Sequence, residues 1–189
     1  MGTDEHMIEA AKALYEKLEL FGDGSRAHEL SVVVKQHALL GVGIAAIPVP
    51  GLDIAALAAN TWAMYARISE IVGISFGENK LRSIASGVIA NIASAVPGLV
   101  LGLAAEGLLK AIPGLGTLGG MAVGAVVNVG IMYAAGKVYI KALEKLVNKG
   151  QPLTEENIAK EAQNASKEKS FVAQAYKEGK AMAKNEKKA

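Results

Sequence analysis

Two long stretches of this chain carry no charged side chain, and they limit what it can fold into. Residues 83–105 form a run of 23 residues without Asp, Glu, Lys or Arg, and residues 111–136 form another of 26. A helix of about 20 apolar residues is long enough to cross a bilayer. The segment between the runs, "EGLLKAIPGLG", holds two charges, a proline and three glycines, which favour a turn. The pattern predicts an apolar helical hairpin.

A second apolar block, residues 30–73, divides in the same way. One predicted arm ends near Ile47, "PVPG" forms the turn, and the other arm starts near Asp53. These arms have about 16–20 residues, which is short for a full crossing, so tilted, re-entrant and interfacial positions all fit. The residues predicted to form the two turns and helix caps are Pro48, Pro50, Gly51 and Asp53 in the first hairpin, and Pro113, Gly114 and Gly116 in the second.

The two ends of the chain are polar. Residues 1–29 are expected to form an amphipathic N-terminal helix and a linker, because apolar side chains recur at helical spacing from Ile8 to Phe21. Residues 150–189 are rich in lysine, and a helix is predicted from Thr154 onward, after Pro152. Its apolar stripe is thin, so a solvated helix or a partly disordered tail is expected there. The sequence thus predicts an all-α protein in three parts, 1–29, 30–149 and 150–189.

Composition narrows the function further. Hydrophobic residues make up 51% of the chain but aromatic residues only 5%, and 21 residues are glycine. Small side chains let membrane helices approach closely, whereas the core of a water-soluble domain is usually filled by larger ones. A net charge of +2, with no run of basic residues interleaved with aromatics, argues against nucleic acid as a partner. The absence of cysteine excludes disulfides and cysteine metal sites.

No catalytic, cofactor-binding or metal-binding residues are predicted, and the chain is not expected to be an enzyme. His6, His28 and His37 have no ligand spacing and are interpreted as surface or interfacial side chains. The segment "GIMYAAGKV", residues 130–138, has one residue too many between its glycines for a phosphate-binding loop and lacks the Ser or Thr after Lys137.

Asp53 is the one carboxylate in a long apolar block, and it has two interpretations. In the first interpretation, Asp53 is an intramembrane group that handles protons or ions, since charged residues within a membrane are costly and usually functional. Alternatively, it caps the helix that follows Pro50 and Gly51, by accepting hydrogen bonds from free backbone N–H groups. The prolines place it at a turn, which favours the cap.

Two further patterns concern helix packing. Asn60, Asn91 and Asn128 place one amide in each of three apolar segments, where hydrogen bonds between helices are favoured over a substrate or ion path. Gly116, Gly120 and Gly124 are four residues apart and share one helix face. This glycine zipper would serve close packing in the bundle, self-association or a pore, and the pattern does not separate these roles.

The pattern "IPVPGLD" followed by "MYARI" and then "IPGLG" resembles a bacterial membrane-associated domain of unknown function. That domain occurs in YcjF-type proteins and at the C-terminus of some Era-like GTPases. The resemblance covers residues 30–146 and rests on Pro and Gly motifs, with these matched positions: Pro48, Pro50, Gly51, Asp53, Met64, Gly73, Pro113, Gly114, Gly116 and Gly120. It implies a helical membrane module that works beside a GTPase, which would here be a separate chain.

These observations predict a non-enzymatic, membrane-embedded scaffold or docking module. The charged connections near Lys35, at 67–82 and at 137–149 fall on one side if both hairpins enter and return. Their lysines and arginines place both termini in the cytoplasm, at a bacterial inner membrane. The expected partners are the lipid bilayer, a separate GTPase chain and further copies of the chain. Two alternatives remain. One is a pore built by glycine-zipper self-association. The other is a soluble oligomer that buries the hairpins between subunits, which the short first hairpin and the helix break expected at Pro97 favour, because a break within a span needs neighbours to satisfy the freed backbone.

Overall fold

A single long helix, α6 (Gly116–Asn148), forms the axis around which the other helices pack. The structure is a computed structural model, and it describes residues 24–45, 52–96 and 116–186. Within these ranges the chain is helical apart from short connections. The other helices are α2 (Gly24–Ala45), α3 (Leu52–Ile71), α4 (Glu78–Ala95), α7 (Glu155–Ser166) and α8 (Lys169–Glu186). The all-α prediction is confirmed.

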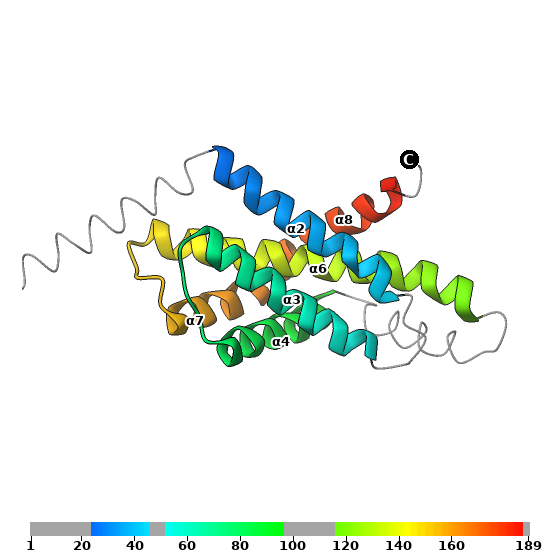
Figure 1. The fold of residues 1–189 in the computed structure, drawn as a ribbon, viewed down its shortest axis with the longest axis horizontal. Helices are drawn as coiled ribbons and strands as arrows, with labels where there is room; N and C mark the ends of the chain where they lie inside the picture. Colours follow the sequence, from blue (N-terminus) through cyan, green and yellow to red (C-terminus); the bar gives the residue numbers. More distant parts are fainter. Residues whose placement is uncertain (1–23, 46–51, 97–115, 187–189) are drawn as a thin grey trace, which may run out of the picture.

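The helices alternate in direction (Figure 1). α2 and α4 run toward one end of the bundle, and α3 and α6 run back from it. α7 and α8 then return along α6. The C-terminal ends of α2 and α4 and the N-terminal ends of α3 and α6 therefore lie at the same end of the molecule. The two predicted hairpin tips, with Pro48, Pro50, Gly51, Pro113 and Gly114, lie outside the described residues, so the hairpins themselves stay a prediction.

Two glycines end helices at the opposite end of the bundle. Gly73 follows α3 with a φ of 70°, and Gly150 follows α6 with a φ of 65°. At each, the glycine and the residue after it donate backbone hydrogen bonds to the last turn of the helix: Gly73 to Glu70 and Ile74 to Ser69, Gly150 to Val147 and Gln151 to Leu146. This is the Schellman arrangement, in which glycine adopts the left-handed conformation that other residues avoid.

The helices in the two long uncharged runs do not coincide with the runs: α4 ends at the break expected from Pro97, and α6 is longer than its run. α4 ends at Ala95, so the uncharged run 83–105 is not one continuous helix. The reason is Pro97, because the residue before a proline is driven out of the helical region, and Val96 is extended. α6 instead continues past Gly136 to Asn148, since Lys137, Lys141 and Lys145 do not interrupt its helical spacing.

The C-terminal segment is packed, which corrects the expectation of a solvated helix or disordered tail. A helix does begin after Thr154, whose hydroxyl accepts a hydrogen bond from the Asn157 amide at 3.3 Å. It breaks at Lys167–Glu168, and both α7 and α8 pack on α6. The thin apolar stripe is sufficient for this because it meets the small-residue surface of α6, and every member of the stripe is buried: Ile158, Ala162, Ala165, Val172 and Tyr176.

Candidate functional site

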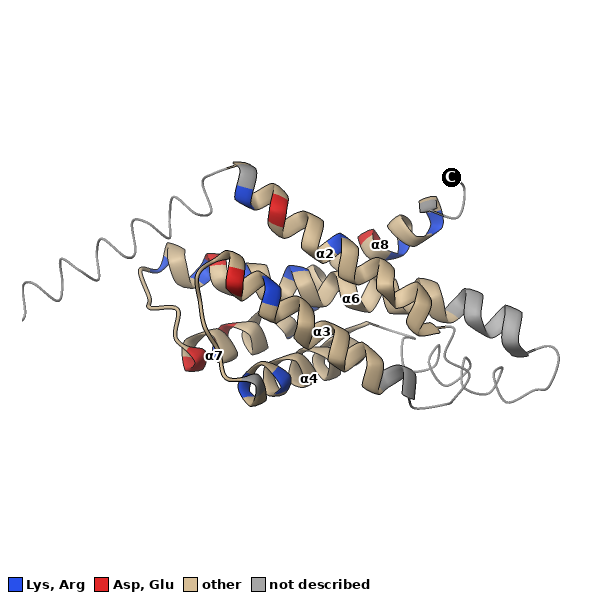
Figure 2. Cartoon of the chain, viewed as in Figure 1, with Lys and Arg blue, Asp and Glu red and all other residues tan. Residues whose placement is uncertain are grey.

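One end of the bundle is free of charge over four helices, and this end is the candidate functional surface. Figure 2 shows the charged residues of α2, α3, α4 and α6 gathered away from the ends of these helices that meet. α2 carries no charge after Lys35, α3 carries only Asp53 before Arg67, α4 carries none after Arg82 and α6 none before Lys137. Asp53 at the start of α3 apart, the first charged residue met on leaving this end is therefore basic on each of the four helices.

The outer surface of this charge-free end is made of small and aliphatic side chains. Leu40 and Val42 on α2 are 57% and 42% exposed, and they are the large hydrophobic residues exposed in the described part of the chain. The other exposed residues of the charge-free segments are Gln36 and Ser83, which adjoin Lys35 and Arg82, and then Gly43, Ala55, Ala59, Ala63, Ser86, Ala90 and Ser94. A surface of this kind has little to hold water and fits an apolar environment.

The length of α6 also suits a bilayer. Its uncharged part, Gly116–Gly136, spans roughly 31 Å at about 1.5 Å per residue, which is close to the thickness of a hydrocarbon core at about 30 Å. By length and composition, one helix in the described part of the chain is able to cross a membrane, Gly124–Asn148, and 72% of its most apolar window is buried in the bundle. Two spans were predicted in the uncharged runs; α4, cut at Ala95, does not qualify.

An aromatic residue lies near the boundary between the charge-free and charged ends. Trp62 of α3 is half-buried, and the guanidinium of Arg82 from α4 lies 4.6 Å from the centre of its ring. This distance is within the range of a cation–π interaction. Tryptophan is enriched at the level of lipid head groups, where its ring is apolar and its surroundings are polar.

The three asparagines of the apolar segments each reach a neighbouring helix. Asn60 of α3 donates to the backbone carbonyl of His37 in α2 at 2.9 Å, and its oxygen lies 2.7 Å from His37 Nδ1. Asn91 of α4 donates to Ser166 Oγ of α7 at 2.8 Å. Asn128 of α6 donates to the Gly41 carbonyl of α2, at a longer 3.4 Å. The amides thus connect helix pairs within one molecule.

The histidine prediction needs correction. His28 is exposed, as expected, and His6 lies outside the described residues, but His37 is 9% exposed and buried between α2 and α3. It is accommodated there because Asn60 supplies hydrogen-bond partners for both its ring and its carbonyl. The sequence gives no signal for this pairing, since the two residues are 23 positions apart on different helices.

A second buried polar group was not predicted. The rings of Tyr65 on α3 and Tyr139 on α6 are stacked with their centres 4.1 Å apart. The Tyr65 hydroxyl donates to the Ala135 carbonyl at 3.0 Å, and the Tyr139 hydroxyl shares a hydrogen bond of 2.8 Å with Ser69. With every hydroxyl partnered, these contacts fix α3 against α6 rather than offer a reactive group.

The predicted glycine and aspartate positions are placed only in part. Gly116 and Gly120 lie in the first turns of α6, but their packing is outside the described residues; Gly124 is buried. Asp53 lies in the first turn of α3, which begins at Leu52. A carboxylate in the first turn complements the positive end of the helix dipole. The contacts of the Asp53 side chain lie outside the described part of the structure, so its role as a helix cap stays a prediction.

Other glycines provide the closest helix contacts. A Cβ atom at Gly136 would lie 2.7 Å from both methyl carbons of Val34, and one at Gly130 would lie 2.6 Å from the ring of Tyr176. A Cβ at Gly41 would lie 3.1 Å from the backbone of Asn128. Sequence spacing pointed to the first part of α6, whereas the close approaches found here are made further along it, to α2 and α8.

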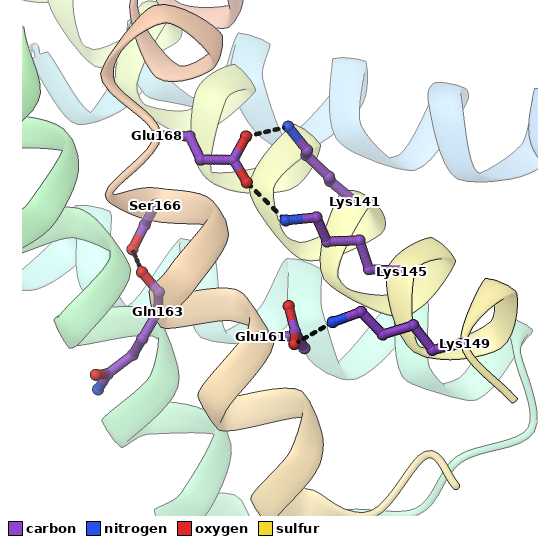
Figure 3. Close-up of polar contacts among 7 residues, drawn as sticks. All are labelled: Lys141, Lys145, Lys149, Glu161, Gln163, Ser166 and Glu168. Atoms are coloured by element: carbon purple, nitrogen blue, oxygen red, sulfur yellow. Dashed lines mark hydrogen bonds and ion pairs between the residues drawn. The ribbon is translucent and has the colours of Figure 1, made fainter. Parts of the chain in front are cut away.

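Three lysines one turn apart hold the α7–α8 corner on α6 (Figure 3). Lys141 and Lys145 each donate to Glu168 at 2.6 Å, and Lys149 donates to Glu161 at 2.8 Å. These hydrogen bonds lower the pKa of Glu168 below its ordinary value of 4.5. Lys141 also lies 3.9 Å from the centre of the Phe171 ring. This contact closes the corner at the start of α8.

The described residues show no constellation suited to catalysis or metal binding. No group of three or more His, Asp or Glu side chains in these ranges is placed to hold a metal ion. A small cavity of about 190 Å³ between α2 and α6 is lined by Lys137, Glu144 and Tyr133 among aliphatic residues. Burial raises the pKa of Glu144 above its ordinary value, although the positive charges of Lys137 and Lys141 act in the opposite direction.

The chain is similar in sequence to a protein family and to a protein that is named as a membrane protein. A family model described as "Domain of unknown function (DUF697)" matches residues 10–167. The chain belongs to the DUF697 family. It is also 35% identical over 152 residues to "Magnetosome membrane protein 22" of Magnetospirillum gryphiswaldense, an alignment that covers 80% of this chain and 70% of that protein. No solved structure matches the chain.

The DUF697 match has an informative C-terminal limit. It takes in α2, α3, α4, α6 and α7 and stops at residue 167, directly before α8 begins at Lys169. The family part of the chain therefore ends at the corner held by Glu168.

Proposed function

We propose that this DUF697 protein is a non-enzymatic membrane module whose charge-free end is embedded in a bilayer. The observation that carries the proposal is the surface of that end: four helices meet there, and beyond Asp53 the first charged residue on each helix is Lys35, Arg67, Arg82 or Lys137. Exposed Leu40 and Val42 would lie in hydrocarbon. The similarity to a magnetosome membrane protein supports the same conclusion.

The orientation follows from the basic boundary. Cytoplasmic segments beside a membrane are enriched in lysine and arginine, so the charged end is proposed to face the cytoplasm at a bacterial inner membrane. Both termini are proposed to be cytoplasmic as well, although α8 as packed on α6 runs toward the charge-free end. There the module would act as a scaffold or as the docking partner of another protein. The resemblance to modules that accompany Era-like GTPases makes a separate GTPase chain the proposed partner, with the charged end as the surface that meets it.

The test uses two positions on one face of α2, two turns apart. Gly43 has no atom within 4 Å of an added Cβ, and both Gly43 and Gln36 are exposed. We expect Gly43→Arg to weaken flotation with liposomes strongly, because an arginine in hydrocarbon costs about 2.5–3.5 kcal/mol. Gln36→Arg, beside Lys35, should float like the native protein. Equal flotation of the two variants would contradict the embedding of this end.

A second candidate function is a water-soluble oligomer, favoured by one specific observation. The most apolar window of α6 is 72% buried within its own bundle, as in the core helix of a soluble protein. In that case the exposed patch around Leu40 and Val42 would meet another copy of the chain. Native protein that stays with the aqueous fraction as a discrete particle, without detergent, would favour this candidate over the membrane module.

A further inference from the structure

α8 covers part of the charge-free length of α6. Gly179 of α8 crosses α6 so closely that a Cβ on it would lie 3.0 Å from the Cα of Gly130 and 2.7 Å from the Cβ of Tyr133. The ring of Tyr176 on α8 also lies against Gly130. The α6 face around Val129, Gly130 and Tyr133 is thereby shielded, although it belongs to the segment proposed to lie in the bilayer.

The outer face of α8 does not suit that depth. Lys177 and Lys184 are exposed on it, and Glu178 is exposed beside Tyr133 of α6, to which it is hydrogen-bonded. Charged side chains are costly inside hydrocarbon. Given the proposed function, on which this step rests, α8 cannot stay on α6 while hydrocarbon surrounds the charge-free end at the level of Gly130.

α8 is attached to α6 mainly by close packing, whereas α7 is also tied to its neighbours by several hydrogen bonds. α7 is tied at several points: Glu155 accepts from the Gly77 amide of α4 at 2.9 Å, Asn91 of α4 bonds Ser166, and Lys149 bonds Glu161. α8 is held at its start by the ion pairs of Glu168, whose side chain is 37% exposed, and along its length by the packing of buried Val172, Ala175, Tyr176, Gly179 and Ala183. Glu178 adds a hydrogen bond with Tyr133 of α6. Exposed ion pairs contribute little stability.

We propose that α8 is a displaceable cover, and that the α6 face beneath it, around Val129, Gly130 and Tyr133, is a concealed lipid-contacting surface. When the charge-free end enters a bilayer, α8 swings out at Lys167–Glu168 and acyl chains take its place. The hinge coincides with the end of the DUF697 match at residue 167. The released helix carries lysines beside an apolar stripe that includes Val172 and Tyr176, and Lys180 lies over the Tyr176 ring; such a helix suits the surface of an anionic bilayer.

The chain has no cysteine, so pairs of introduced cysteines can carry spin labels specifically. One pair, Asn148→Cys with Asn185→Cys, joins the end of α6 to the end of α8; a control pair, Asn148→Cys with Asn164→Cys, joins α6 to α7. All three side chains are exposed. With vesicles of phosphatidylcholine and phosphatidylglycerol, we expect the α6–α8 distance distribution to shift and broaden, and the α6–α7 distribution to stay unchanged.

Two results would overturn the proposal, and they are distinguishable. An unchanged α6–α8 distance in protein that floats with the vesicles shows that α8 stays in place, while the membrane function stands. Protein that does not float at all removes the membrane function and this inference with it. As a further check, Glu168→Gln should release α8 at a lipid concentration about fivefold lower than the native protein needs, and Glu156→Gln, an exposed glutamate of α7, should not. Equal behaviour of the two variants would show that the ion pairs of Glu168 do not help to hold α8 on α6.

Discussion

At the scale of single residues, close helix crossings depend on glycine. A methyl group at Gly136 would press on Val34 and, at 3.1 Å, on the sulfur of Met64, whereas one at Gly43 would meet nothing within 4 Å. We expect Gly136→Ala to destabilise the fold by about 1–3 kcal/mol through overpacking. Gly43→Ala should instead stabilise it by about 0.5–1 kcal/mol, since alanine is the better helix former. Thermal unfolding of both variants measures the difference, and equal shifts would contradict the packing described.

The contact between His37 and Asn60 is the second test at this scale. Asn60→Ala removes both hydrogen bonds to His37 and leaves the ring nitrogen of a buried histidine without its partner. A loss of about 1–3 kcal/mol in unfolding free energy is expected. Asn148→Ala, at an exposed position, serves as the control and should change stability little. An Asn60→Ala protein as stable as this control would show that the pair contributes nothing.

Residue type alone predicted part of these contacts. An asparagine in an apolar helix needs a partner, so bonds from Asn60, Asn91 and Asn128 to other helices were predictable in kind. Which residue each would meet was not, because it depends on the rotation and height of the neighbouring helix. The burial of His37 and the stacking of Tyr65 on Tyr139 depend on such long-range placement and carry no local signal.

At the scale of elements, the hold on α8 should depend on pH. The pKa of Glu168 is lowered in the folded state by Lys141 and Lys145, so its contribution is present above the ordinary value of 4.5 and is lost as pH falls through the lowered folded pKa. Without vesicles, the Asn148–Asn185 spin-label distance should therefore stay constant from about pH 7 down to about pH 5 and broaden below that. The same titration of a Glu168→Gln protein should show less change, and identical curves would contradict the role of Glu168.

Helix boundaries show where sequence analysis succeeds and where it stops. Thr154 with Glu155 and Glu156 correctly marked the start of α7 because capping is a local interaction. Pro97 accounts for the end of α4, although the absence of charge had suggested a longer helix. The packing of α7 and α8 was missed because small side chains give a weak hydrophobic pattern, and only the matching surface of α6 shows that Ala162, Ala165 and Ala175 are sufficient.

At the scale of the whole molecule, the uneven distribution of charge is the main support for membrane embedding. A soluble bundle would be expected to carry charges over its entire surface, whereas here the helix ends that meet at one end carry a single charged residue, Asp53, in the part of the chain that the structure describes. The sequence predicted this asymmetry directly, because charge-free runs are visible without any structure. The sequence did not predict that α8 would lie over part of the charge-free length of α6. Because of this position, the proposed embedding requires α8 to be displaced from α6.

The most direct test of the central claim is fractionation of cells that express the native protein, followed by washing the membranes in alkaline carbonate. Carbonate removes proteins held by charge or by peripheral contacts and leaves those with segments in the hydrocarbon. The account predicts that the protein stays in the membrane pellet and needs detergent for release. Recovery in the carbonate supernatant, or in the soluble fraction as a defined particle, would contradict embedding of the charge-free end.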